Sequence, residues 1–132
     1  MKDAATMAGA RILVIEDNPL NLELVRALLE VHGYEVIDSG NAEDGIERAR
    51  MEQPQLIFID LSLPGTDGLA ATQLLKADAA TRHIPVVALT AHAMKGDDER
   101  ARQAGCDGYL TKPIDTRSFP AVVARFLARE QG

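Results

Sequence analysis

The chain contains a single cysteine, and its charge balance shows no excess of basic residues. That cysteine is Cys106, so an internal disulfide and a metal cluster built on thiolates are both excluded. Lys and Arg number 14 against 20 Asp and Glu, which gives a formal net charge of −6. Such a chain offers no basic field to hold nucleic acid or an anionic membrane. We therefore expect no nucleic-acid partner, no membrane insertion, and a Cys106 buried as a small hydrophobic side chain.

Targeting and linker segments are also missing from the sequence. The first residues, MKDAATMAGA, contain no apolar h-region, and no later apolar run is long enough to span a bilayer. No repeat or low-complexity stretch divides the chain, and 132 residues allow one sizeable core. We expect a soluble, cytoplasmic protein with one domain over 11–129, a flexible extension over 1–10, a tail over 130–132 and no output domain.

Five short segments have the composition of β-strands. Three of them, RILVIEDNP, PQLIFIDLSLPG and IPVVALTAH, carry continuous apolar runs bounded by breakers, and YEVID and DGYLT are shorter. Runs rich in Ile and Val at this length are typical of strands buried on both faces, as in a parallel sheet.

Helical patterns lie between these strands. Asn18 and Pro19 predict an N-cap and a first turn, and Gly33 predicts the end of that helix. For the last helix we prefer Ser118 over Asp115 as the cap, because Pro120 then falls in the first turn, where it removes no helical hydrogen bond. The other helices are expected from Asn41, from near Asp67 and from about His92 to Ala104, and the expected inward positions include Leu24, Val25, Leu28, Leu29, Ile46, Ala49, Leu69, Thr72, Leu75, Val122, Val123, Phe126 and Leu127.

The regular alternation of strand and helix predicts an α/β fold. Crossovers between parallel strands are right-handed and helical, so the helices cover both faces of one parallel sheet. For five strands this gives a flavodoxin-like (βα)5 three-layer sandwich with strand order 2-1-3-4-5, whose ligand site lies at the carboxyl ends of strands 1 and 3. Glu16 and Asp17 follow strand 1, and Asp60 ends strand 3.

Three carboxylates at one point of the sheet require either raised pKa values or a cation. Mg²⁺ suits a site of few carboxylates that leaves coordination positions for water and phosphate. Taken singly, each acid fits equally well as a turn or cap residue. Thr90 and Lys112 follow at the same edge, where a hydroxyl and an ammonium group complete a phosphoryl site with Asp60 as the attacking carboxylate.

Four segments in this order, VIEDN, FIDLSLPGTDG, ALTAHA and YLTKPI, resemble receiver domains of bacterial two-component response regulators. The resemblance extends from residue 11 to about residue 127. The stretch TAHAMKGDDERARQAGCDGYLTKP is closest to single-domain regulators of the DivK type, although receivers of hybrid kinases share much of it.

The resemblance implies a role for each residue of the phosphoryl site. Asp60 corresponds to the phosphoacceptor, and Asp17 to a direct Mg²⁺ ligand with Glu16 acting largely through water. The backbone carbonyl of Ser62 would supply a further metal ligand. Lys112 would pair with the phosphoryl group, and its bond to Pro113 is expected to be cis.

The resemblance also implies partners and a way of transmitting the signal. A histidine kinase or histidine phosphotransferase would donate the phosphoryl group, and Thr90 and Tyr109 would act as the switch hydroxyl and switch aromatic. Output would pass to a protein partner through helix 4, strand 5 and helix 5. Such a domain catalyses only its own phosphorylation and dephosphorylation, at a rate adjusted by the side chains of Ser62 and His92.

Specific residues distinguish this interpretation from several others. An aspartyl phosphatase of the haloacid-dehalogenase type expects a second Asp two residues after the nucleophile, where this chain has Ser62. A flavin or dinucleotide protein expects a glycine-rich loop after strand 1, where this chain has EDNPLN. A receiver that has lost phosphorylation, or one cut from a hybrid kinase or longer regulator, remains compatible with the sequence. His32, His83 and His92 are too dispersed to predict a metal site.

Overall fold

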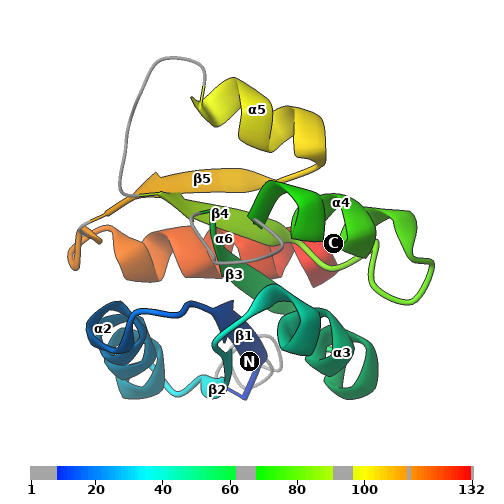
Figure 1. Cartoon of the computed structure of the whole chain (residues 1–132). Helices are drawn as coiled ribbons and strands as arrows, with labels where there is room; N and C mark the ends of the chain where they lie inside the picture. Colours follow the sequence, from blue (N-terminus) through cyan, green and yellow to red (C-terminus); the bar gives the residue numbers. More distant parts are fainter. Residues whose placement is uncertain (1–8, 62–67, 91–96, 113, 132) are drawn as a thin grey trace.

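The computed structural model describes residues 9–61, 68–90, 97–112 and 114–131. At its centre lies a sheet of five parallel strands in the order β2-β1-β3-β4-β5 (Figure 1). This order confirms the predicted flavodoxin-like fold. The strands are β1 (Arg11–Ile15), β2 (Glu35–Ser39), β3 (Leu56–Asp60), β4 (Val86–Thr90) and β5 (Gly108–Thr111).

Five described helices cover the two faces of the sheet and complete the predicted three layers. Helices α3, α4 and α5 contribute to one hydrophobic cluster against the sheet, and α2 and α6 contribute to a second cluster. The helices are α2 (Pro19–Val31), α3 (Ala42–Glu52), α4 (Gly68–Ala77), α5 (Asp97–Ala104) and α6 (Phe119–Gln131). None of the described helices is long and apolar enough to cross a membrane.

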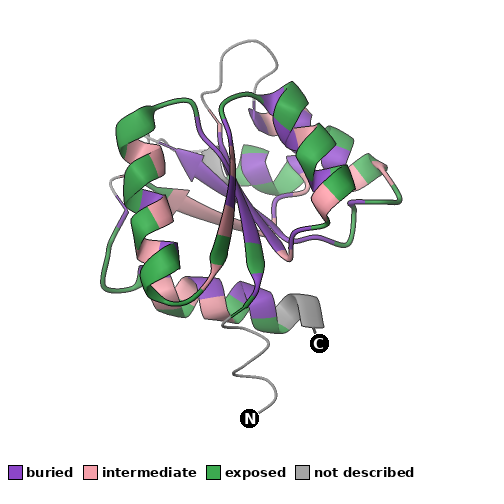
Figure 2. Ribbon diagram, turned by 90° about the horizontal axis from the view of Figure 1, so that it is seen from below, coloured by how far each residue is buried: buried purple, intermediate pink, exposed green. Residues whose placement is uncertain are grey.

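The continuous apolar runs of the sequence are explained by burial from both sides. Every residue of β3 and β4 is buried, and Figure 2 shows purple strands between the helices. Successive strand residues point to opposite faces, so Ile57 and Ile59 join the α3, α4 and α5 side while Leu56 and Phe58 join the α2 and α6 side. Two covered faces leave no solvent-facing position to be polar, which removes the alternation typical of a half-buried strand.

Helix α2 begins as predicted but presents a different apolar face. The side-chain oxygen of Asn18 accepts hydrogen bonds from the backbone N–H groups of the first turn, and Gly33 follows the helix at φ 89°. Val25 and Leu29 are buried, whereas Leu24 is 38% exposed, so its prediction as a core residue is wrong. The i and i+4 pair of Val25 and Leu29 sets the contact with the sheet, and Leu24 lies beside that line with Leu20.

Helix α6 begins at Phe119, which confirms the later of the two possible starts. The side chain of Asp115 accepts from the N–H of Arg117, and its carbonyl accepts from the N–H of Phe119. Asp115 therefore organises a separate turn before the helix. Pro120 is the second helical residue, where the missing N–H has no helical partner to lose.

Several predicted boundaries shift or fall outside the described residues. Positions 1–8, Asp67 and His92 are outside them, so the extension and two helix starts stay predictions. Ala10, expected in the extension, is 1% exposed, and its carbonyl accepts from the N–H of Glu35. At the other end α6 continues to Gln131, beyond the expected boundary at 129, because no Pro or Gly interrupts the helix there.

Candidate functional site

The carboxyl ends of β1 and β3 bring three acids together, as predicted. Glu16 follows β1 and is 1% exposed, Asp60 ends β3 and is 3% exposed, and Asp17 is exposed. One carboxylate oxygen of each residue lies within 4.8 Å of the other two. We refer to Glu16, Asp17 and Asp60 as the acid cluster.

Lys112 directly follows the carboxyl end of β5 and contacts the acid cluster from there. Its Nζ lies 2.9 Å from Oε1 of Glu16 and 3.1 Å from Oδ2 of Asp60, so one ammonium group contacts both buried carboxylates. The backbone N–H of Lys112 donates to the carbonyl of Thr90 at 2.7 Å, which fixes the lysine beside the end of β4. The sequence placed Lys112 at this edge but did not identify Glu16 as its partner.

The electrostatics of the cluster follow from burial and from these contacts. Burial raises the pKa of Glu16, and the neighbouring Asp60 raises it further, while hydrogen bonds from Lys112 and the Asn18 backbone oppose the increase. Burial alone would lower the pKa of Lys112. Its hydrogen bonds with Glu16 and Asp60 outweigh that effect, so the pKa of Lys112 is raised and the ammonium stays charged at neutral pH.

The side chain of Glu16 is held by the turn that begins α2. Its Oε2 accepts the backbone N–H of Asn18 at 3.1 Å, and the backbone N–H of Glu16 donates to the carbonyl of Ser39 at 2.9 Å. Asn18 in turn caps α2 through its side chain. The geometry of the acid cluster is thus tied to the helix cap, because one residue serves both.

Thr90 and Tyr109, the two predicted switch residues, lie on neighbouring strands. Thr90 ends β4 and is 4% exposed. Tyr109 lies on β5 opposite Ala88 of β4. It is half-buried and packs against the hydrophobic cluster on the α3, α4 and α5 side of the sheet. Thr90 is the last residue of β4, so it lies at the carboxyl ends of the strands, where the acid cluster is. Tyr109 lies further back along β5.

A close contact at the start of α4 was not predicted. A Cβ on Gly68 would lie 2.5 Å from the carbonyl oxygen of Asp60 and 2.7 Å from Cα of Leu61. Only glycine fits at such a distance, so the first turn of α4 rests directly on the backbone that follows Asp60. In the sequence, the glycines after Asp60 indicated a turn but did not reveal this packing.

Some predicted residues cannot be compared with the structure or do not join the site. Ser62, His92 and Pro113 lie outside the described residues, so the metal-ligand carbonyl and the cis bond stay predictions. His32 and His83 are exposed, and neither belongs to the acid cluster. Cys106 is 9% exposed, and burial raises the pKa of its thiol, which agrees with its prediction as a buried hydrophobic residue.

The donor set of the cluster fits a hard divalent cation. All three groups are carboxylates, and the atoms that could bind an ion lie close enough together to share one. Mg²⁺ prefers oxygen ligands of this kind and binds through one or two carboxylates while retaining water. The residues present therefore match the metal predicted from the sequence.

Comparisons with known proteins identify the family. The model of the response regulator receiver domain matches residues 12–124. The polar-differentiation response regulator DivK of Brucella anthropi is 46% identical over 116 residues, which cover 88% of this chain and 94% of that protein.

Solved structures of receiver domains agree with this result. The receiver domain of a sensor histidine kinase from Pseudomonas aeruginosa, described with a magnesium ion coordinated in its active site cleft, has a TM-score of 0.84 at 34% identity, covering 91% of this chain and 98% of that one. A CheY-like receiver domain from Methanospirillum hungatei has a TM-score of 0.84 at 25% identity, covering 93% and 97%. With its strand order, its acid cluster and these similarities, the chain belongs to the response regulator receiver domain family.

Proposed function

We propose that this protein accepts a phosphoryl group on Asp60 with Mg²⁺ and relays a two-component signal by contacting another protein. The observation that carries the proposal is the environment of Asp60. This buried carboxylate ends a central strand, forms part of the acid cluster and lies 3.1 Å from the ammonium of Lys112. A nucleophile on a rigid strand, beside a cation site and a fixed positive charge, meets the requirements of phosphoryl transfer.

Each residue of the site has a distinct part in this proposal. Asp17 and Asp60 would hold the metal directly, Glu16 would do so largely through water, and the carbonyl of Ser62 would be a further ligand. When bound, Mg²⁺ neutralises charge on the phosphoryl oxygens. Lys112, already fixed beside Asp60, binds an oxygen of the transferred group.

The donor is a phosphohistidine on a histidine kinase or histidine phosphotransferase. An Oδ of Asp60 forms the new P–O bond while the P–N bond of phosphohistidine breaks and the imidazole leaves with its electron pair. The similarity to DivK and to a kinase receiver domain supports this class of donor. The protein acts in the cytoplasm, catalyses only its own phosphorylation and dephosphorylation, and passes its signal to a protein rather than to DNA.

Acetyl phosphate and a metal chelator test the proposal directly. We expect the intact mass to increase by one phosphoryl group when acetyl phosphate is added with Mg²⁺, and we expect no increase with EDTA. Borohydride trapping followed by peptide mapping should locate the modification at Asp60. Incorporation that is unaffected by EDTA, or that maps to another residue, would contradict the proposal.

The proposed switch predicts a separate result for Thr90→Ala. A phosphoryl group on Asp60 adds charge and acceptor oxygens that attract the Thr90 hydroxyl, and Tyr109 then turns inward beside β4. The chain has two tyrosines, so incorporation of 3-fluorotyrosine gives one ¹⁹F signal for Tyr109 and one for Tyr34, which packs in the opposite cluster. Phosphorylation should move the Tyr109 signal in the wild type.

In Thr90→Ala we expect phosphorylation to persist while this ¹⁹F shift is lost. The Tyr34 signal provides the internal control, because it lies on the α2 and α6 side of the sheet. A Tyr109 shift of wild-type size in phosphorylated Thr90→Ala would show that the hydroxyl does not operate the switch.

A further inference from the structure

A buried polar link connects α4 to the segment before β5. Thr72 is fully buried, and its Oγ1 donates to the carbonyl of Gly68 at 2.8 Å. The thiol of Cys106 donates to the same Oγ1, with an S to O distance of 3.7 Å. A buried hydroxyl costs free energy unless it is hydrogen-bonded, and here both its donor and acceptor functions are used.

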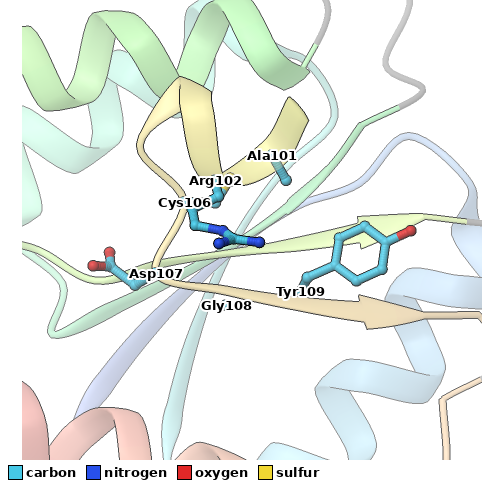
Figure 3. A pocket seen from close by; sticks show the side chains of 6 residues that line it. All are labelled: Ala101, Arg102, Cys106, Asp107, Gly108 and Tyr109. Carbon is cyan, nitrogen blue, oxygen red and sulfur yellow. The ribbon is translucent and has the colours of Figure 1, made fainter. Parts of the chain in front are cut away.

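Each end of this link adjoins a feature of functional interest. At one end, Gly68 rests on the carbonyl of Asp60 and on Cα of Leu61. At the other end, Cys106 lines a pocket of about 200 Å³ between α5 and β5. Figure 3 shows this pocket, whose lining residues are Ala101, Arg102, Cys106, Asp107, Gly108 and Tyr109.

We propose that Thr72 is a positioning residue that fixes the first turn of α4 against the Asp60 backbone and, through Cys106, couples this backbone to the pocket. The inference rests on the proposed function, because it assigns Thr72 a role in shaping the metal and phosphoryl site. It adds a route that does not pass through Thr90, although both routes end at the pocket that Tyr109 lines.

The positioning role of Thr72 depends on the lack of free space at Gly68. A hydroxyl that donates to the carbonyl four residues earlier bends the helix at that turn. In α4 the Thr72 hydroxyl therefore sets the inclination of the first turn relative to the rest of the helix. Because even a Cβ at Gly68 would overlap the carbonyl of Asp60, a change of inclination at this turn has to move the Asp60 and Leu61 backbone. The other buried helical positions nearby, Ala71 and Leu75, are apolar, so packing alone gives no reason for a hydroxyl at Thr72.

Thr81 provides a matched control for testing this role. It is also fully buried, and its Oγ1 donates to the carbonyl of Leu75 at 2.7 Å, near the opposite end of α4. Thr72→Val and Thr81→Val therefore remove the same kind of hydrogen bond with nearly unchanged volume. Thr72→Ser retains the hydroxyl and should restore the wild-type behaviour.

We expect Thr72→Val to weaken Mg²⁺ binding by roughly 3- to 10-fold in calorimetric titrations without phosphodonor. Loss of a group that directly supports a metal ligand typically weakens metal binding by about 10-fold or more, and the effect of Thr72 should not exceed the lower end of that range. Thr81→Val and Thr72→Ser should bind Mg²⁺ as the wild type does. Equal affinities of Thr72→Val and Thr81→Val would overturn the inference. A wild type that fails to bind Mg²⁺ would contradict the proposed function instead.

Hydrogen exchange decides the positioning role even without the metal. The N–H of Leu61 donates to the carbonyl of Leu89 at 2.9 Å, so its exchange rate reports the backbone after Asp60. We expect faster exchange of the Leu61 N–H in metal-free Thr72→Val than in metal-free Thr81→Val. The two variants are compared under conditions that give them the same free energy of unfolding. Unchanged exchange at Leu61 would overturn the positioning role.

The coupling to the pocket is tested through Cys106, the only cysteine of the chain. Coupling between two sites is reciprocal, so saturating Mg²⁺ should slow the reaction of Cys106 with a thiol reagent by about twofold or more in the wild type. Thr81→Val should show the same Mg²⁺ effect, and Thr72→Val should lose it. Equal reaction rates with and without Mg²⁺ in the wild type would disprove the link to the pocket.

Discussion

Asp60→Asn is expected to abolish phosphoryl transfer from acetyl phosphate, with no mass increase at any time at which the wild type is modified. The amide is nearly isosteric with the carboxylate, so the fold around β3 is retained. It lacks the negative oxygen that attacks phosphorus, and it also withdraws one of the three anionic ligands of the acid cluster. Nucleophile and metal ligand are therefore lost in one substitution.

Asp78→Asn is a suitable control for this experiment. Asp78 forms an ion pair with Arg50, 2.6 Å away, between the ends of α3 and α4, and it does not belong to the acid cluster. The control should be phosphorylated at the wild-type rate, as judged by intact mass. Phosphorylation of Asp60→Asn to the wild-type extent would exclude Asp60 as the acceptor.

Lys112→Met should destabilise the metal-free protein by about 3 kcal/mol, because breaking a buried ion pair leaves uncompensated charge. The change leaves Glu16 and Asp60 without an ammonium that contacts both of them. Urea unfolding of the wild type and the variant, each in EDTA, measures the difference. Mg²⁺ should then stabilise Lys112→Met more than the wild type, because the cation no longer competes with Lys112 for the same carboxylates.

Lys76→Met separates this effect from the general cost of removing a partly buried, ion-paired lysine. Nζ of Lys76 contacts Asp107 at 2.9 Å and the carbonyl of Ile84 at 2.8 Å, outside the acid cluster. We expect this variant to lose stability as well, but to respond to Mg²⁺ as the wild type does. An equal Mg²⁺ response of the two variants would contradict competition between Lys112 and the cation.

The stability lost in Lys112→Met should also depend on pH. The folded-state pKa of Lys112 is raised above its ordinary value of 10.5, so its contribution is fully present below that value. The contribution disappears as the pH rises through the raised pKa. The difference in unfolding free energy between the wild type and Lys112→Met should therefore decrease as the pH rises above 10.5.

The sequence predicted those features that depend on local chemistry. Two-sided burial requires the apolar runs of β3 and β4, and the carboxyl ends of parallel strands necessarily gather Glu16, Asp17 and Asp60. Pro120 could be placed because a helix accepts proline without loss of a hydrogen bond only in its first turn. Hydrophobic burial, strand direction and the geometry of proline were sufficient for these inferences.

Features that depend on side-chain packing across the fold were not accessible in the same way. Leu24 is the same residue type as the buried Leu29, and only the orientation of α2 on the sheet leaves it exposed. The hydrogen bond between Cys106 and Thr72 joins residues 34 positions apart, and no periodicity relates them. The contact of Gly68 with the Asp60 backbone likewise arises only when α4 is packed on β3.

The separation of the interior into two clusters has a consequence for how sequences of this kind diversify. Side chains on the α2 and α6 side do not share a cluster with those on the α3, α4 and α5 side, because the strands lie between them. Substitutions far apart without shared partners have nearly additive effects on stability. A lineage could therefore rework the layer that holds Tyr109, Cys106 and Thr72, and so acquire a new binding partner, while the layer around Phe58 and Phe119 continues to maintain the fold.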